Sequence, residues 1–133
     1  MARHAVRRYM SADPTVISST QTLVEAHRVM REKGIRHLPV VDGGRLVGVV
    51  SQRDLYLLET LRGVDAAREL VEEAMTGEPF VVAPDSALLE VVEAMAAERR
   101  GSAIVVEEGA VVGIFTSTDA LRALAELLRG PGG

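Results

Sequence analysis

The feature that most constrains the fold of this chain is a stretch of eight residues that occurs twice. Residues 47–54 read VGVVSQRD, and residues 112–119 read VGIFTSTD. Each stretch is an apolar run that ends in a hydroxyl residue, two further residues and an aspartate. A shift of 65 positions aligns the two halves of the 133-residue chain without a gap, with matched proline, glycine and aspartate residues. The sequence therefore predicts two copies of one structural unit.

Each half shows the same order of expected elements. In the first half, a proline opens a short strand at residues 14–17, and a helix follows whose apolar side chains recur every three or four positions. An Asp-Gly-Gly turn separates two apolar runs, at residues 38–41 and 46–50, which predicts a hairpin. A second helix is expected over residues 51–60. The equivalent elements of the second half are a hairpin of residues 103–106 and 111–115 and a helix of residues 116–128.

The ends of the first helix in each half are predicted from capping preferences. Thr20 and Asp85 occupy equivalent positions. Both residue types are favoured at a helix N-terminus, where their side-chain oxygens accept hydrogen bonds from free backbone N–H groups. Gly34 is expected to end the first of these helices.

The composition predicts how the two halves are stabilised. Apolar residues make up 47% of the chain and aromatic residues only 3%, so the core must be aliphatic. A half of about 55 residues is marginal alone, and its strands are apolar on both faces, so the halves are expected to pack sheet against sheet. The predicted domains are an N-terminal segment (1–9), a first domain (10–61), a linker (62–74), a second domain (75–128) and a disordered tail (129–133).

Charge and hydropathy narrow the class of protein. The net charge is −4, from 15 basic and 19 acidic residues, which argues against nucleic-acid binding. The chain has no cysteine and no apolar run of the ~18 residues that a membrane-spanning helix needs, so a soluble, cytoplasmic protein is expected. We interpret a small basic cluster, Arg3, Arg7 and Arg8, as a solvated, loose chain end.

The residues give little sign of catalysis or of a metal centre. His4, His27 and His37 lack the spacing of metal ligands. No nucleophile–base pair, phosphate-binding glycine loop or pair of catalytic carboxylates stands out. We therefore expect a protein that is not an enzyme and requires no cofactor, and a nucleotide hydrolase is the catalytic alternative.

The repeated junction has two interpretations. Ser51 with Asp54, and Thr116 with Asp119, fit a capping box, in which the hydroxyl caps the helix and the carboxylate accepts a hydrogen bond from the cap amide. The functional interpretation uses the same geometry. Free N–H groups and the helix dipole attract phosphate, and an aspartate one turn into the helix suits the hydroxyls of a ribose. On this interpretation a nucleoside phosphate lies across the junction.

The repeated patterns resemble a tandem pair of CBS domains, a regulatory module also called a Bateman module. The matching runs are GIRHLPVVD at residues 34–42, VGVVSQRDL at 47–55 and VGIFTSTDAL at 112–121. The resemblance covers residues 10–128. It implies an α/β fold of two strand-helix-strand-strand-helix repeats, related by a pseudo-twofold axis and packed through their sheets. It also implies two clefts for adenosine compounds such as AMP, ADP, ATP or S-adenosylmethionine.

The resemblance further implies two sets of ligand-binding residues, each drawn from both repeats. The first set, for the first cleft, is Val16, Ile17, Thr20, Ile35, Arg36, His37, Thr116, Thr118 and Asp119. The second set, for the second cleft, is Ser51, Arg53, Asp54, Val81, Val82, Asp85, Arg100 and Gly101. On charge alone we favour the first cleft for a phosphorylated ligand, because a neutral Gly-Ser pair replaces the Arg36-His37 pair in the second repeat. Arg53 and Arg100 leave occupancy of both clefts open.

The leading hypothesis is a stand-alone regulatory module that binds an adenosine-containing ligand between its repeats. It would signal to an unidentified protein through a change of conformation or of dimer packing. The resemblance implies a homodimer, with candidate contacts at Leu57, Leu58, Leu61, Leu121, Leu124, Leu127 and Leu128. The alternative is a ligand-free dimerisation or protein-interaction module with the same fold. Asp119→Ala would abolish stabilisation by ligand in the first case and cost about 1 kcal/mol of capping in the second.

Overall fold

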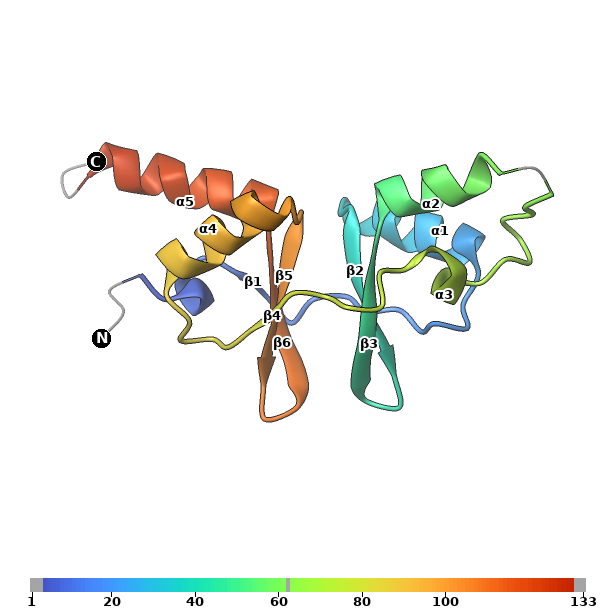
Figure 1. Cartoon of the computed structure of the whole chain (residues 1–133), viewed down its shortest axis with the longest axis horizontal. Helices are drawn as coiled ribbons and strands as arrows, with labels where there is room; N and C mark the ends of the chain where they lie inside the picture. The colour runs from blue at the N-terminus through green and yellow to red at the C-terminus, as the bar shows by residue number, and fades with distance from the viewer. Residues whose placement is uncertain (1–3, 62, 131–133) are drawn as a thin grey trace. The chain divides into compact units, whose positions relative to one another are not determined.

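The computed structural model describes residues 4–61 and 63–130 of the chain (Figure 1). The chain forms two compact units. The first-repeat unit is Thr15–Pro79, and the second-repeat unit is Met1–Pro14 together with Phe80–Gly133. Each unit combines helices with a sheet and contains one copy of the repeat, which confirms the predicted α/β class and the two-repeat organisation. The packing of the two sheets about a pseudo-twofold axis stays a prediction.

The first-repeat unit is a hairpin covered by helices. Strands β2 (His37–Asp42) and β3 (Arg45–Ser51) pair antiparallel. Helices α1 (Leu23–Lys33) and α2 (Gln52–Glu59) lie on one side of this hairpin, and the short helix α3 (Val71–Ala74) packs beside α2. The hairpin and its two flanking helices are therefore the elements that the apolar periodicity predicted.

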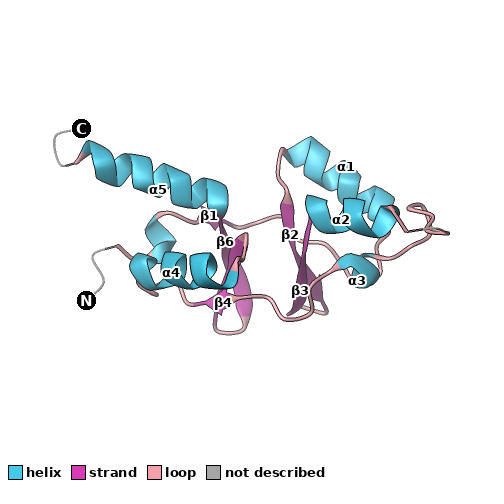
Figure 2. Cartoon of the chain, turned by 45° about the horizontal axis from the view of Figure 1, so that its top comes forward, coloured by secondary structure: helices cyan, strands magenta, loops and turns pink. Residues whose placement is uncertain are grey.

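The second-repeat unit has the same plan with a larger sheet (Figure 2). Its elements are η1 (Val6–Arg8), β1 (Ser11–Ala12), β4 (Val81–Val82), α4 (Leu88–Glu98), β5 (Ser102–Glu107), β6 (Ala110–Thr116) and α5 (Ser117–Arg129). The strand order across the sheet is β1-β6-β5-β4. Strand β4 is parallel to β5, whereas the other neighbouring pairs are antiparallel.

The segment that precedes each repeat in the sequence completes the sheet of the other repeat. Residues 11–12 form β1, which pairs with β6 so that Ser11 lies opposite Ile114. The position equivalent to Ser11 is Thr76, which forms an antiparallel bridge to Val49 in the first-repeat unit. Both lead segments are therefore built into folded units. The part of residues 62–74 that the structure describes belongs to the first-repeat unit.

Two equivalent glycines allow these lead segments to approach the hairpins. A Cβ atom at Gly48 would lie 2.6 Å from the backbone oxygen of Thr76 and 2.8 Å from the sulfur of Met75. A Cβ atom at Gly113 would fall on the sulfur of Met10. Glycine is therefore needed at Gly48, where backbone would clash, whereas at Gly113 a Cβ atom would displace only the flexible side chain of Met10.

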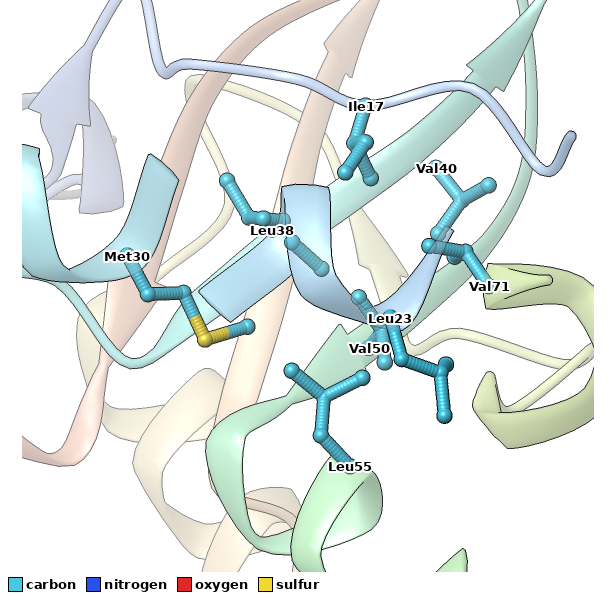
Figure 3. Close-up of a cluster of buried hydrophobic side chains, with 9 residues drawn as sticks. Ile17, Leu23, Met30, Leu38, Val40, Val50, Leu55 and Val71 are labelled. Atoms are coloured by element: carbon cyan, nitrogen blue, oxygen red, sulfur yellow. The ribbon is translucent and has the colours of Figure 1, made fainter. Parts of the chain in front are cut away.

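Each unit has its own aliphatic core. In the first-repeat unit, Leu23, Leu38, Val50 and Leu55 are fully buried, and Val71 from α3 joins them (Figure 3). The second core contains the buried residues Val6, Leu88, Val91, Met95, Ala103, Val105, Phe115 and Ala123. A fully buried Val6 means that the chain end is part of this core from η1 onward. Arg7 and Arg8 are exposed, as expected for solvated side chains, but they belong to η1 and not to a fraying end, and Arg3 lies outside the described residues.

The helix starts differ from the sequence prediction in both repeats. The N-cap of α1 is Thr22, which forms a capping box with Glu25, and the N-cap of α4 is Ala87, which has no side-chain cap. The capping predictions for Thr20 and Asp85 are therefore wrong. The hydroxyl groups of Thr20 and Ser18 are hydrogen-bonded at 3.0 Å. Thr20 lies in the loop before α1, two residues before the N-cap Thr22.

The boundaries of the hairpin strands and of the second helix in each repeat agree with the prediction to within one residue. Gly34 ends α1 in the left-handed conformation at φ 66°, as predicted, and Arg99 adopts the equivalent conformation at φ 56° after α4. The predicted strand at residues 14–17 contains only an isolated parallel bridge, from Ile17 to Val40. Gly130 follows α5, and the predicted disordered tail otherwise lies outside the described residues, apart from Arg129, which ends α5. Within residues 4–61 and 63–130, no helix is long and apolar enough to cross a membrane.

Candidate functional site

The two repeated junctions are capping boxes at the starts of α2 and α5. In the first-repeat unit, the backbone N–H of Asp54 donates to Ser51 Oγ at 3.0 Å, and the backbone N–H of Ser51 donates to Asp54 Oδ2 at 2.9 Å. In the second-repeat unit, the N–H of Asp119 donates to Thr116 Oγ1 at 3.4 Å, and the N–H of Thr116 donates to Asp119 Oδ2 at 2.9 Å. The hydroxyl and carboxylate of each motif are thus fixed beside a helix N-terminus, as the spacing predicted.

The two aspartates differ in how fully their own chain engages them. Asp119 is 3% exposed, and its Oδ1 atom accepts from Ser11 Oγ at 3.3 Å and from the Arg122 guanidinium at 3.4 Å. Asp54 is half-buried, and its Oδ1 atom accepts no hydrogen bond from the described residues. Because a carboxylate oxygen can accept two hydrogen bonds, Asp54 offers a free acceptor where Asp119 does not.

His37 lies beside the capping box of the first-repeat unit. It begins β2 directly opposite Ser51 in the hairpin register. Burial lowers the pKa of His37 below its ordinary value, while the nearby carboxylate of Asp54 opposes that shift and Arg36 adds to it. The structure therefore groups His37 with Ser51 and Asp54 in one unit, although the resemblance assigns them to different sets.

The other first-set residues of this unit lie on the segment before α1 and on the loop after α1. Val16 is exposed and Ile17 is buried. Arg36 has an exposed side chain, and its backbone oxygen accepts a hydrogen bond from the N–H of Gln52, the first residue of α2. The half-buried Ile35 precedes it, so the loop after α1 is tied directly to the start of α2.

The loop at residues 18–20 is held by an aspartate that the sequence analysis assigned only to a turn. The Oδ2 atom of Asp42 accepts from Ser19 Oγ at 2.5 Å, and its Oδ1 atom accepts from Ser18 Oγ at 2.9 Å and Ser19 N at 3.0 Å. These hydrogen bonds from Ser19 and Ser18 lower the pKa of Asp42. Thr20 is therefore positioned by this serine–aspartate cluster.

The second-set residues of the second-repeat unit are partly engaged elsewhere. Val81 and Asp85 are exposed, whereas Val82 is half-buried in β4. The guanidinium of Arg100 bonds Glu98 at 2.8 Å and lies 5.7 Å from the centre of the Phe80 ring. The backbone oxygen of Gly101 accepts from Ser117 N, which repeats the Arg36–Gln52 contact of the first unit.

Three other predicted residues lie in or next to the capping boxes. Arg53 and Thr118 are exposed in the first turns of α2 and α5, and the half-buried Thr116 caps α5. Each predicted set combines residues of both units. The structure brings together the members that share a unit, and the closure of either set into a cleft stays a prediction.

The sequence analysis missed Ser11 and Arg122 as partners of Asp119. The spacing of Arg122 three residues after Asp119 was a readable signal, because such pairs are neighbours on a helix. Ser11 gave no signal, since it lies 108 residues from Asp119 in the chain. In the part of the chain that the structure describes, every buried side-chain nitrogen or oxygen has a hydrogen-bond partner, and no group of three or more metal-ligating residues occurs.

Two α/β units with equivalent capping-box junctions define a tandem-repeat module, and comparison with known proteins identifies its family. The CBS domain family matches the chain twice, at residues 6–58 and 71–126. The chain therefore belongs to the CBS domain family and carries a tandem pair of these domains.

The relatives include enzymes and ligand-binding modules. The chain is 34% identical over 119 residues to inosine-5'-monophosphate dehydrogenase of Korarchaeum cryptofilum. The aligned region covers 86% of this chain but only 24% of that enzyme. Among solved structures, the CBS domain pair of protein MJ0100, in complex with 5'-methylthioadenosine and S-adenosyl-L-methionine, has a TM-score of 0.84 at 27% identity and covers 92% of this chain and 96% of its own. The structure of CBSX2 in complex with AMP has a TM-score of 0.79 at 26% identity. The match covers 95% of this chain and 99% of CBSX2.

Proposed function

We propose that this protein is a non-catalytic regulatory module that binds an adenosine-containing ligand: AMP, ADP, ATP or S-adenosylmethionine. Two similar CBS pairs bind AMP or S-adenosylmethionine with 5'-methylthioadenosine, which supports this class of ligand. The observation that carries the proposal is the free Oδ1 atom of Asp54 beside the N-terminus of α2, because a ribose hydroxyl needs an acceptor of this kind.

Asp54 and Asp119, one in each predicted set, differ in whether a ligand must displace an existing hydrogen bond of the carboxylate. A ribose hydroxyl can reach Asp54 without any loss of an existing hydrogen bond, since its Oδ1 atom accepts none from the described residues. At Asp119 the same hydroxyl must replace Ser11 or Arg122. Each set holds equal numbers of arginine and aspartate side chains, and His37 adds a further polar group to the first set, so both sets belong to the proposal.

The signal would pass through a homodimer. Several leucines on α2, just after it and on α5 have exposed side chains, and a contiguous exposed apolar patch marks an interaction site. Their exposed fractions are 56% for Leu57, 58% for Leu61, 66% for Leu121, 50% for Leu124, 43% for Leu127 and 77% for Leu128. A ligand would then act by favouring one of two arrangements of the module or of its dimer.

The ligand-free interaction module is the second candidate, and the carboxylate of Asp119 favours it. That group is buried and accepts hydrogen bonds from Thr116, Ser11 and Arg122, so it has a complete structural role without a ligand. On this view both aspartates serve only as caps.

A thermal-shift panel separates the two candidates. The panel contains AMP, ADP, ATP and S-adenosylmethionine, with NAD, GTP and inosine monophosphate for comparison. A ligand at 100 times its dissociation constant adds about 2.7 kcal/mol to the free energy of unfolding, which raises the midpoint by roughly 4 °C. The proposal predicts such a shift for at least one adenosine compound and its loss in the double variant Asp54→Ala, Asp119→Ala. No shift with any compound supports the interaction module instead.

A further inference from the structure

A basic hollow lies between α1 and α2 of the first-repeat unit. It has a volume of about 750 Å³, which lies within the range of small-molecule sites. Its lining includes the side chains of Arg28, Arg31 and Arg36, together with Gln52 and Tyr56. The two helices and the loop after α1 thus place three arginines around one concave surface.

The three guanidinium groups are available to a ligand. Arg28, Arg31 and Arg36 are exposed, and none of them forms an ion pair with the residues that the structure describes. The carboxylate in the lining is that of Glu59, and its Oε2 atom contacts His27 Nε2 at 2.5 Å. The hollow therefore combines three guanidinium groups, of which Arg28 lies near the carboxylate of Glu25, with the carboxylate of Glu59, which already contacts His27.

An aromatic ring forms one wall of the hollow. Tyr56 is 55% exposed, and its ring centre lies 5.0 Å from that of His27, with the planes tilted by 40°. His27 in turn contacts Glu59. The Tyr56 ring thus packs on His27, and the rest of the ring is accessible to solvent.

The equivalent hollow of the second repeat shows that the fold does not require this basic character. Between α4 and α5, a hollow of about 620 Å³ is lined by Leu89, Val92, Leu121 and Leu124. These positions correspond to Val24, His27, Tyr56 and Glu59 after the shift of 65. The same shift turns Arg28, Arg31 and Arg36 into Glu93, Ala96 and Gly101. Because one scaffold carries both linings, the arginines are not needed for packing or helix formation.

We propose that the hollow between α1 and α2 binds an oligophosphate, an anion with two or more linked phosphate groups. Guanidinium groups bind phosphate oxygens in bidentate pairs, and several of them around one concavity suit a chain of phosphates better than a single one. The hollow shares Arg36 with the first set of predicted adenosine contacts, but Arg28 and Arg31 belong to neither set, so oligophosphate binding can be tested apart from adenosine binding.

Inorganic tripolyphosphate tests the proposal without a nucleoside. Calorimetric titration at about 0.15 M salt, where distant surface charges are largely screened, is expected to show one tripolyphosphate bound per chain. Arg31→Gln removes one charged hydrogen-bond donor and should weaken binding about tenfold. Arg45→Gln is the matched control, because Arg45 is exposed at the start of β3 in the same unit and does not line the hollow. It should change the affinity by less than about twofold.

Two further measurements test where tripolyphosphate binds and whether its binding is independent of adenosine compounds. Amide resonances of Arg31 and Gly34 should shift with tripolyphosphate, whereas that of Gly109 in the other unit's hairpin should not. The double variant Asp54→Ala, Asp119→Ala should retain tripolyphosphate binding even if it loses adenosine compounds. Absence of binding to the unaltered chain, or equal weakening by Arg31→Gln and Arg45→Gln, would overturn the proposal.

Discussion

At the scale of single residues, the hydrogen bond from Ser11 to Asp119 sets the two capping boxes apart. The donor lies on the segment that precedes the first repeat, and the acceptor belongs to the second repeat. The bond joins a neutral hydroxyl to a buried carboxylate at 3.3 Å, and it occupies an oxygen that a ribose would use. Ser11 therefore competes with any ligand at Asp119.

Removal of that hydroxyl should strengthen binding at the Asp119 side. Ser11→Ala frees Oδ1 of Asp119 from one donor, and we expect the dissociation constant of an adenosine ligand at this position to fall several-fold, about the effect of 1 kcal/mol. Calorimetry of the variant measures it, and Thr60→Ala, which also removes a hydroxyl but lies outside both predicted sets, is the control. Unchanged affinity in Ser11→Ala would show that Asp119 does not contact the ligand.

His37 should make the stability of the protein depend on pH. Burial lowers its pKa in the folded chain below the ordinary value of 6.5, so the unfolded chain takes up the proton first as the pH falls. The free energy of unfolding should therefore decrease as the pH drops below about 6.5, until the folded state is protonated as well. Urea unfolding at several pH values between about 8 and 5 measures the slope. His37→Gln should flatten it, and an equal slope in that variant would contradict the assignment to His37.

At the scale of elements, the first helices of the two repeats are capped unequally. Thr22 and Glu25 form a capping box on α1, whereas the equivalent positions on α4 are Ala87 and Glu90. Ala87 already has extended N-cap dihedral angles, φ −66° and ψ 129°. The second repeat thus keeps the backbone and the glutamate of the box but lacks the hydroxyl.

Restoration of that hydroxyl should stabilise the protein. Ala87→Thr supplies the missing cap of α4, and we expect a gain of about 1 kcal/mol in the free energy of unfolding. Chemical denaturation measures the change. Ala87→Val, which has a similar shape and no hydroxyl, should give no gain, and equal stabilisation by both variants would attribute the effect to packing instead.

The two faces of α5 differ, and the proposed dimer depends on the apolar one. Leu121→Glu places a charge on that face and should shift a dimer toward monomer, as measured by sedimentation at several concentrations. Arg129 is exposed on the polar face of α5 with Arg122 and Glu126, so Arg129→Glu is the control. A monomeric unaltered protein, or an unchanged dimer in Leu121→Glu, would contradict a dimer through α5.

The sequence could predict the elements of each repeat because their signals are local. The hairpins, the capping boxes and the glycine end of α1 each depend on residues within a few positions of one another. The starts of α1 and α4 were misplaced by two residues because Thr20 and Asp85 are good caps in isolation. The loop before α1 is instead held by Asp42, whose serine partners lie more than twenty positions away.

At the scale of the whole molecule, the exchange of lead segments was not readable from the sequence. The shift of 65 matches Met10 with Met75 and Gly113 with Gly48. Each methionine therefore fits either glycine equally well by pattern, and only the structure shows that Met10 packs on the second repeat and Met75 on the first. The second repeat is thereby joined to the segment that precedes the first repeat, and the first repeat to the segment between the two repeats.

The measurement that tests the regulatory module most directly is calorimetric titration of the whole chain with AMP, ATP and S-adenosylmethionine. Saturable binding of at least one of these compounds, with one or two sites per chain, is the expected result. The double variant Asp54→Asn, Asp119→Asn should lose it, because an amide keeps the size of each side chain but removes the carboxylate. Heats equal to dilution for all three compounds would contradict the account and leave a ligand-free CBS pair.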